Sequence, residues 1–275
     1  MVRIITDSAA DFEPRELEQL NVACIPLKVM FGNDEYEENI SLSKNRFYEL
    51  LLGSGELPKT AQASPQVLLD LFEAARDQGE EAIYICISSA LSGTYQTAMM
   101  SRNMVDAESC HVFDSRNATG GQRLLVQYAT KLRDEGKSAS QILAALEDAR
   151  QRIVLFACID TLEYLYKGGR ISHTVYKLGT LANIKPVISI DRTGSVIIPA
   201  KAMGMRKGMD ILCKHLENPD PDFPVYAMFT NNRSVAETLA GKMGSVADDR
   251  IIQVGAAIGS HIGPDACGLV YVKAK

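Results

Sequence analysis

The fold is decided by the stretch Ile83-Tyr84-Ile85-Cys86-Ile87-Ser88-Ser89-Ala90-Leu91-Ser92-Gly93-Thr94. In it, a short apolar run leads directly into a cluster of hydroxyl-bearing and small residues. The run predicts a buried parallel strand, and the cluster predicts the start of the helix that follows. The stretch therefore indicates one strand-to-helix unit of an α/β protein.

Two further apolar runs lead into similar clusters. They are Arg3-Ile4-Ile5 before Thr6-Asp7-Ser8-Ala9-Ala10, and His111-Val112-Phe113 before Asp114-Ser115 and Gly120-Gly121. In an open parallel sheet, ligands bind outside the carboxyl ends of the strands. Helix N-termini there present unpaired N–H groups and the positive end of the helix dipole. The three clusters therefore predict a site for an anionic group held by hydroxyls and backbone amides.

The pattern of the chain changes near residue 160. Up to that point strands alternate with amphipathic helices, which predicts a doubly wound parallel sheet in a Rossmann-like α/β domain over residues 1–159. Beyond it, residues 186–190 and 195–200 form a hairpin pattern, and the remaining elements mix helices with strands. We therefore expect a smaller α+β domain over residues 160–275.

Other segments carry more specific expectations. Residues 22–30 and 153–159 are largely apolar and predict two more strands of the first domain, while residues 35–38 predict a polar turn. The glycines around His261 predict a flexible loop after a strand at 250–257.

Composition excludes several classes of protein. The chain has 275 residues, 46% of them hydrophobic, and a net charge of -5. The negative charge argues against nucleic acid as a partner. No apolar stretch approaches the roughly 18–20 residues that span a bilayer, and the N-terminus enters a strand without a signal-peptide pattern, so we expect a cytoplasmic protein. The scattered cysteines and histidines predict reduced buried thiols and no metal site.

The hydroxyl and carboxylate candidates have more than one interpretation. Ser92 lies at a strand-to-helix turn, where it could cap the helix or contact a ligand, but the G-x-S-x-G pattern of a nucleophile elbow is absent. Asp7 and Asp114 could each cap a helix, bind a metal or hold a loop, and capping is the commonest of these roles. Gly120-Gly121 could approach a phosphate, but the complete nucleotide-binding motifs are missing.

The basic candidates are equally open. Lys167-Gly168-Gly169-Arg170 lies between two predicted helices and could form a corner, or an exposed cationic contact for a phosphate or a partner. Arg206-Lys207 is a second basic pair, of a kind that usually forms a solvated helix face. His261 would become a candidate only if it lay near the hydroxyl cluster.

Taken together, these segments resemble the DegV family over essentially the whole chain. The family is bacterial and comprises fatty-acid-binding proteins, some of which are the acyl-binding subunit of an ATP-dependent fatty acid kinase. The resemblance rests on Thr6-Asp7-Ser8-Ala9-Ala10, Ser88-Ser89-Ala90-Leu91-Ser92-Gly93-Thr94-Tyr95, Leu162-Glu163-Tyr164-Leu165, Lys167-Gly168-Gly169-Arg170-Ile171, Asn183-Ile184-Lys185-Pro186-Val187, His261-Ile262-Gly263-Pro264 and Gly268-Leu269-Val270-Tyr271.

The resemblance implies a role for individual residues. It implies that the fatty-acid carboxylate lies at Thr60, Ser92, Gly93 and His261. It also implies that Arg170, Arg206 and Lys207 face a phosphate or the kinase. Because these three lie in the predicted second domain, we expect replacement of Arg170 or Arg206 by alanine to leave fatty-acid binding nearly intact.

Four positions depart from the family pattern. Ala61 replaces a hydroxyl-bearing residue and Ala63 a proline, while Asp265 and Cys267 stand where glycine and leucine are usual. An acidic residue near the head group would disfavour an acyl phosphate.

The resulting hypothesis is a non-catalytic carrier that needs no cofactor or metal. It would bind a long-chain fatty acid in a tunnel between the two domains and present the carboxylate to a kinase. The alternative is a small hydrolase or phosphotransferase that uses Asp7, Asp114 or Ser92.

Overall fold

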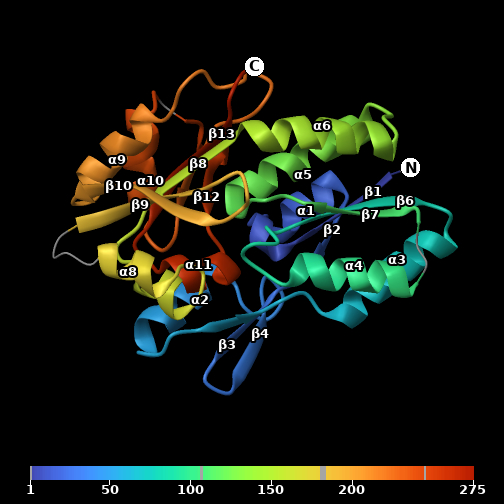
Figure 1. Ribbon diagram of the computed structural model, residues 1–275, viewed down its shortest axis with the longest axis horizontal. Helices are drawn as coiled ribbons and strands as arrows, with labels where there is room; N and C mark the ends of the chain where they lie inside the picture. The colour runs from blue at the N-terminus through green and yellow to red at the C-terminus, as the bar shows by residue number, and fades with distance from the viewer. Residues whose placement is uncertain (1, 106–107, 180–183, 245) are drawn as a thin grey trace.

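The computed structural model describes residues 2–105, 108–179, 184–244 and 246–275. Within them, three sheets are surrounded and separated by helices (Figure 1). The sequence pattern of residues 172–181 predicts a helix, and its last two residues lie outside the described residues, as does Asn183 of the family resemblance.

The N-terminal half is built on the predicted parallel sheet. Its strands lie in the order β2-β1-β6-β7, and all neighbours are parallel. They are β1 (Val2–Asp7), β2 (Val22–Ile25), β6 (Glu81–Cys86) and β7 (Cys110–Asp114). Successive residues of a strand point to opposite faces, so Ile4 packs on one face and Ile5 on the other.

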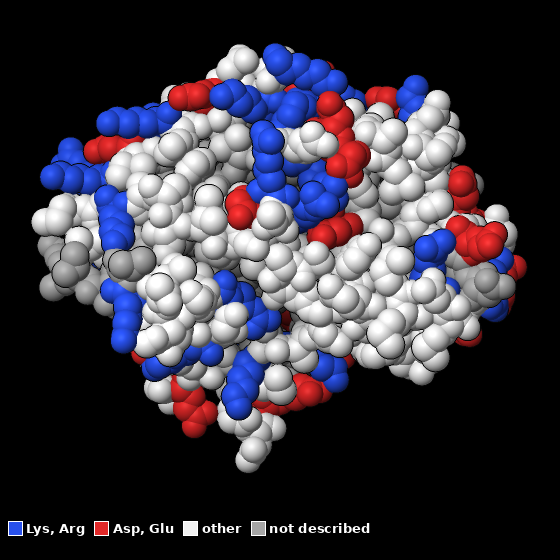
Figure 2. All heavy atoms as spheres, viewed as in Figure 1, with Lys and Arg blue, Asp and Glu red and all other residues white. Residues whose placement is uncertain are grey.

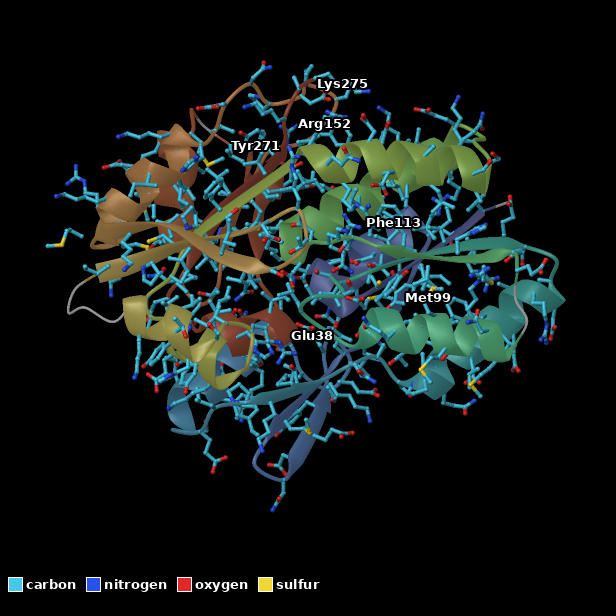
Figure 3. The ribbon with its side chains drawn as sticks, viewed as in Figure 1. Glu38, Met99, Phe113, Arg152, Tyr271 and Lys275 are labelled. Carbon is cyan, nitrogen blue, oxygen red and sulfur yellow. The ribbon has the colours of Figure 1, made fainter. Side chains whose placement is uncertain are left out.

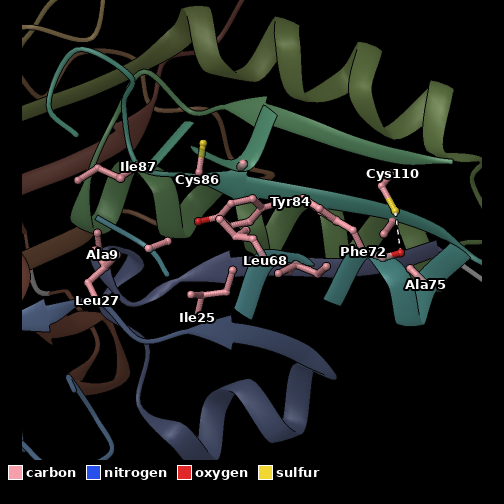
Figure 4. Close-up of a cluster of buried hydrophobic side chains, with 14 of the residues drawn as sticks. Ala9, Ile25, Leu27, Leu68, Phe72, Ala75, Tyr84, Cys86, Ile87 and Cys110 are labelled. Carbon is pink, nitrogen blue, oxygen red and sulfur yellow. Dashed lines mark hydrogen bonds between the residues drawn. The ribbon is translucent and has the colours of Figure 1, made fainter. Parts of the chain in front are cut away.

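Helices cover both faces of this sheet, which confirms the doubly wound prediction. Figure 4 shows the packing on one face, where Leu68 and Phe72 meet Tyr84. That face carries α3 (Pro65–Asp77) and α4 (Thr94–Met104), and the other carries α1 (Pro14–Leu20), α5 (Thr119–Asp134) and α6 (Ala139–Arg152). Because helices follow β6 and β7 directly, the hydroxyl clusters lie at the carboxyl ends of these strands.

The second sheet has six strands in the order β10-β9-β8-β13-β11-β12. They are β8 (Ile153–Cys158), β9 (Ile184–Ile190), β10 (Val196–Met203), β11 (Tyr226–Phe229), β12 (Ile251–Gln253) and β13 (Cys267–Val272). The predicted hairpin is confirmed, since β9 and β10 pair antiparallel.

The placement of β8 corrects one expectation. We expected residues 153–159 to join the parallel sheet, but β8 lies between β9 and β13 and pairs antiparallel with both. An apolar strand is buried equally well in either sheet, so its composition does not determine its neighbours. The division into domains at residues 159 and 160 stays a prediction.

A third, three-stranded sheet corrects two further expectations. Residues 22–30 do not form one strand, because Pro26 separates β2 from β3 (Lys28–Phe31), and a proline nitrogen has no hydrogen to donate to a ladder. The expected polar turn at 35–38 is instead strand β4 (Asp34–Glu37). The sheet has the order β4-β3-β5, where β5 (Lys59–Ala61) carries Thr60.

The remaining helices complete the layers around the sheets. They are α2 (Lys44–Gly53), α7 (Glu163–Lys167), α8 (His173–Gly179), α9 (Met205–Lys214), α10 (Arg233–Lys242) and α11 (Ala256–Ile262), with short 3₁₀ turns at Ser8–Ala10 and Asp248–Arg250. Helix α11 lies between the six-stranded and three-stranded sheets (Figure 1). His261 is therefore in a helix and not in the predicted flexible loop.

Candidate ligand-binding site

A cavity lies between the parallel sheet and the six-stranded sheet. The space between its lining atoms is about 940 Å³ including the open end. Its lining is mainly aliphatic, including Leu27, Ile87, Leu155, Ile188, Val254 and Ile258.

Three hydroxyls in the lining are already hydrogen-bonded within the protein. Ser189 Oγ donates to the Leu155 carbonyl at 2.7 Å, and Thr230 Oγ1 donates to the Pro264 carbonyl and accepts from the Ala266 N–H. The Thr119 hydroxyl lies 3.7 Å from the Met228 sulfur. Because the polar atoms of these three side chains already have partners, the part of the cavity wall that they form is effectively apolar.

A different polar group gathers where β5, the loop after β6, the corner after α7 and helix α11 meet. It consists of Thr60, Ser92, Arg170 and His261, which all line the cavity. We call these four residues the head-group cluster. The structure thus brings Thr60, Ser92 and His261 to the wall of one cavity, and their role at a carboxylate stays a prediction.

Thr60 and His261 are in direct contact. Thr60 Oγ1 and His261 Nε2 lie 2.8 Å apart, while the buried Nδ1 of His261 has no hydrogen-bond partner among the described residues. A methyl group on Gly168 would lie 2.2 Å from that Nδ1, so glycine is needed for the corner after α7 to approach the imidazole. One imidazole nitrogen thus remains without a protein partner.

The imidazole is held neutral. Burial, aided by the positive charge of Arg170, lowers the pKa of His261 from 6.5 to about 3. Desolvation disfavours the charged form, and a nearby cation disfavours it further. At neutral pH His261 is therefore a hydrogen-bonding group without a charge, and Arg170 is the cation of the head-group cluster.

Ser92 lies in a loop that the surrounding hydroxyls hold in place. Its Oγ lies 2.9 Å from Thr94 Oγ1, and Thr94 Oγ1 in turn accepts the Ala63 N–H at 3.2 Å. Gly93 directly precedes the first residue of α4 and is exposed. The Gln62 side chain approaches it from one side, and a methyl group on Gly93 would lie 2.0 Å from the Gln62 Oε1. The segment after β5 and the start of α4 are thus tied together.

Arg170 corrects an expectation drawn from its position in the chain. We expected it to lie outside the hydroxyl cluster, but its Nε donates to the Leu91 carbonyl at 3.0 Å, directly before Ser92. Its Nη1 donates to the Gly168 carbonyl at 2.6 Å. The corner that follows α7 folds back, with Gly169 at φ +74°, and so carries Arg170 into the cavity wall.

Arg206 and Lys207 lie elsewhere. Both are exposed near the start of α9, on the outer side of the six-stranded sheet. On the face shown in Figure 2, basic and acidic side chains are interspersed between large uncharged areas.

The two candidate catalytic carboxylates are engaged by their own loops. Asp7 is fully buried and accepts bonds from the Tyr84 hydroxyl, the Gln122 amide and the backbone N–H groups of Ala9 and Ile87. Burial raises its pKa. Asp114 accepts from the backbone and hydroxyl of Ser89 and from the Arg116 N–H. Both carboxylates hold the hydroxyl clusters in shape.

The four departures from the family pattern fall in different environments. Ala61 and the buried Cys267 line the cavity, whereas Asp265 is exposed and is not part of the lining. Ala63 is buried, and its N–H donates to Thr94, which a proline at this position could not do. The alanine therefore adds a bond between the β5 segment and the Ser92 loop.

Two properties of the described residues bear on chemistry. They contain no group of three or more His, Cys, Asp or Glu side chains that could hold a metal ion. None of the helices they form is long and apolar enough to cross a membrane.

A family model described as "Uncharacterised protein, DegV family" matches residues 1–274. The chain belongs to the DegV family. A DegV domain-containing protein of Caldanaerobacter subterraneus subsp. tengcongensis is 31% identical over 276 residues, which cover 98% of each chain.

Solved structures of DegV proteins share the fold. A DegV family protein from Thermus thermophilus, described by its fatty-acid binding, superimposes with a TM-score of 0.88 at 25% identity, covering 99% of each chain. DegV from Bacillus subtilis, described as a fatty acid binding protein, gives a TM-score of 0.84 at 28% identity, again over 99% of each chain.

Proposed function

We propose that this DegV protein binds a long-chain fatty acid, with its tail in the cavity and its carboxylate at the head-group cluster. The observation that carries the proposal is the pairing of a mainly aliphatic cavity with one group of polar side chains: Thr60, Ser92, Arg170 and His261. The description of the Thermus thermophilus and Bacillus subtilis relatives as fatty-acid-binding supports it.

Burial of the tail supplies most of the affinity. Each methylene taken out of water contributes about 0.8 kcal/mol, so a long acyl chain contributes on the order of 10 kcal/mol before the costs of association. The head-group cluster then orients the ligand and selects its end group. Arg170 supplies the positive charge, and Thr60, Ser92 and the neutral His261 supply hydrogen bonds.

The finer part of the proposal is presentation to a kinase. Gly93 is exposed beside Ser92, so this end of the cavity is near the protein surface. A carboxylate bound there would be accessible to an ATP-dependent fatty acid kinase subunit, which would convert it into an acyl phosphate. The exposed pair Arg206 and Lys207 would contact that partner or the phosphate.

The first experiment asks whether the protein traps a lipid. Native mass spectrometry of the purified protein should show an added mass that matches a fatty acid, because release would expose a large apolar area to water. Titration of lipid-stripped protein with oleate and palmitate should then restore the complex. A ligand-free spectrum together with no binding of either acid would contradict the proposal.

The second experiment tests presentation. With a fatty acid kinase subunit and ATP, Arg206→Ala and Lys207→Ala should slow acyl-phosphate formation while fatty-acid affinity stays unchanged. Charged contacts at the edge of an interface act mainly on the rate of association, so the defect should be largest at low ionic strength and should shrink as salt screens the contacts. Unchanged rates in both variants would exclude this surface as the contact.

A further inference from the structure

Helix α11, which carries His261, is held at its N-terminal end by two buried carboxylates. The Gly255 N–H donates to Asp11 Oδ1 at 2.9 Å, and the Ala257 N–H donates to Glu38 Oε1 at 3.2 Å. Asp11 and Glu38 are each only 1% exposed. Figure 3 shows Glu38 beside α11, near the centre of the molecule. Residues more than 200 positions away in the chain thus fix the helix that forms part of the cavity wall.

The two carboxylates lie on either side of one backbone position. A methyl group on Gly255 would lie 2.1 Å from Glu38 Oε1 and 3.0 Å from Asp11 Oδ1. The second oxygen of each carboxylate, Asp11 Oδ2 and Glu38 Oε2, is buried without a hydrogen-bond partner among the described residues. Two ionised carboxylates so close together, away from water, repel each other strongly.

The surrounding charges offset a double ionisation only in part, because Lys44 and Arg123 favour the charged form of Asp11 but burial outweighs them. Lys44 Nζ and Arg123 Nη1 donate to the Asp11 backbone carbonyl, and these cations already form ion pairs with Glu13 and Glu16, respectively. The other groups that act on the pair are uncharged, namely the hydroxyls of Ser8, Tyr48 and Thr119 and the thiol of Cys24. On α11 itself the titratable residue is His261, which stays neutral above about pH 3. One proton retained by the pair relieves the repulsion.

We propose that Asp11 and Glu38 are positioning residues for the head-group cluster, and that they hold α11 in its binding position only while they retain one proton. The inference rests on the proposed fatty-acid function and adds a control of the same site by pH. With the proton present, both N–H groups at the start of α11 keep their acceptors. Once both carboxylates are ionised, they repel each other and move apart. Their separation loosens the first turn of α11 and shifts Ala257, Ile258 and His261 in the cavity wall.

The pKa values agree with this geometry in direction. Burial raises the pKa of Asp11 from 3.8 to about 6, and burial together with the charge of Asp11 raises the pKa of Glu38 from 4.5 to about 7. A carboxyl with a raised pKa stabilises the fold at low pH, and that contribution is lost as the pH rises through the raised value. The hydrogen bonds to Asp11 and Glu38 should therefore hold α11 less firmly as the pH rises from about 6 to about 8.

The test compares the native protein with Glu38→Gln, which cannot lose the proton but keeps an amide oxygen for the Ala257 N–H. We expect oleate affinity of the native protein to fall about five- to a hundredfold between pH 6 and 8.5, the range of ordinary coupling between two sites. Glu38→Gln should lose no more affinity over this range than the ionisation of oleate itself causes. Ionisation of oleate is common to both proteins and cancels in the comparison. Glu37→Gln, a neighbouring change outside the pair, should follow the native profile.

Hydrogen exchange supplies a readout that does not need the ligand. After correction for the intrinsic pH dependence, amides of residues 255–262 should become less protected above pH 7 in the native protein but not in Glu38→Gln. Asp11→Asn serves as the second variant if Glu38→Gln does not fold. If the variant and native profiles coincide in affinity and in exchange, the proposal is overturned. A native protein that binds no fatty acid at any pH would contradict the proposed function alone, and exchange would still decide the role of the pair.

Discussion

Thr60 and His261 are 201 residues apart in the chain, and their side chains meet at 2.8 Å between Oγ1 and Nε2. Thr60 comes from an edge strand of the three-stranded sheet, and His261 comes from the last turn of α11. No sequence motif links β5 and α11, the two elements that this contact joins. It also places two hydrogen-bonding groups without charge next to the guanidinium of Arg170.

Replacing the hydroxyls should weaken binding of the acid selectively. A carboxylate that loses one hydrogen-bond donor loses about 1–3 kcal/mol, which is roughly five- to a hundredfold in affinity. Thr60→Val and Ser92→Ala should each weaken oleate binding by that order in isothermal titration. Binding of oleyl alcohol should change less, and the two losses should not add in the double variant, because both side chains act on one group. Equal losses for acid and alcohol would mean that the hydroxyls shape the cavity and do not contact the carboxylate.

Arg170 should matter for binding, contrary to the expectation from sequence. Arg170→Ala removes the charge of the head-group cluster and the bond to the Leu91 carbonyl, so oleate affinity should fall about ten- to a hundredfold, corresponding to about 1.5–3 kcal/mol for a bond to a charged group. Arg206→Ala, which changes an exposed arginine on α9, is the matched control and should leave the affinity unchanged. Displacement of a fluorescent fatty acid measures the affinity of both variants. A native-like affinity of Arg170→Ala would favour the original expectation that Arg170 contacts a partner protein and not the fatty acid.

The neutral His261, which is partly buried, should make the fold sensitive to acid. Its pKa is about 3 in the folded protein and about 6.5 in the unfolded chain, so the unfolded state takes up a proton first as the pH falls. The stability that comes from the neutral imidazole is complete above pH 6.5 and is lost progressively toward pH 3. The melting temperature of the native protein should therefore fall faster between pH 6.5 and 4 than that of His261→Asn, as measured by scanning calorimetry. Parallel curves would show that the imidazole titrates normally.

Thr230 should contribute to stability through its two hydrogen bonds. It is fully buried, and its hydroxyl links the Pro264 carbonyl to the Ala266 N–H. Thr230→Val keeps the shape of the side chain but leaves the Ala266 N–H unpaired, while the Pro264 carbonyl keeps its bond from the Asn231 N–H. The free energy of unfolding should therefore fall by about 1–3 kcal/mol in urea titrations. Thr238→Val, which removes a hydroxyl from the exposed side of α10, should cost much less. A loss in Thr230→Val no larger than in this control would show that water replaces the missing bonds.

Local patterns in the sequence determined the parallel sheet and the position of Ser92. The alternation of apolar runs with hydroxyl clusters depends on neighbouring residues only, and each buried strand needs its apolar side chains whatever its partners are. The same information located the hairpin of β9 and β10, because a turn is set by the few residues that form it. The resemblance to the DegV family, carried by motifs in their order, then named Thr60 and His261.

Only the tertiary structure decided which distant segments meet. The apolar residues of β8 suit either sheet, and the ladder that they join is fixed by the edges that β9 and β13 present. Arg170 follows a glycine corner whose direction depends on close packing of Gly168 against His261. Asp11 and Glu38 are of a residue type that is usually exposed, yet they are buried here, where the start of α11 supplies donors for them. Sequence patterns report a residue's local conformation and its need for burial, whereas contacts across 100 or 200 residues depend on how complementary surfaces of whole elements pack.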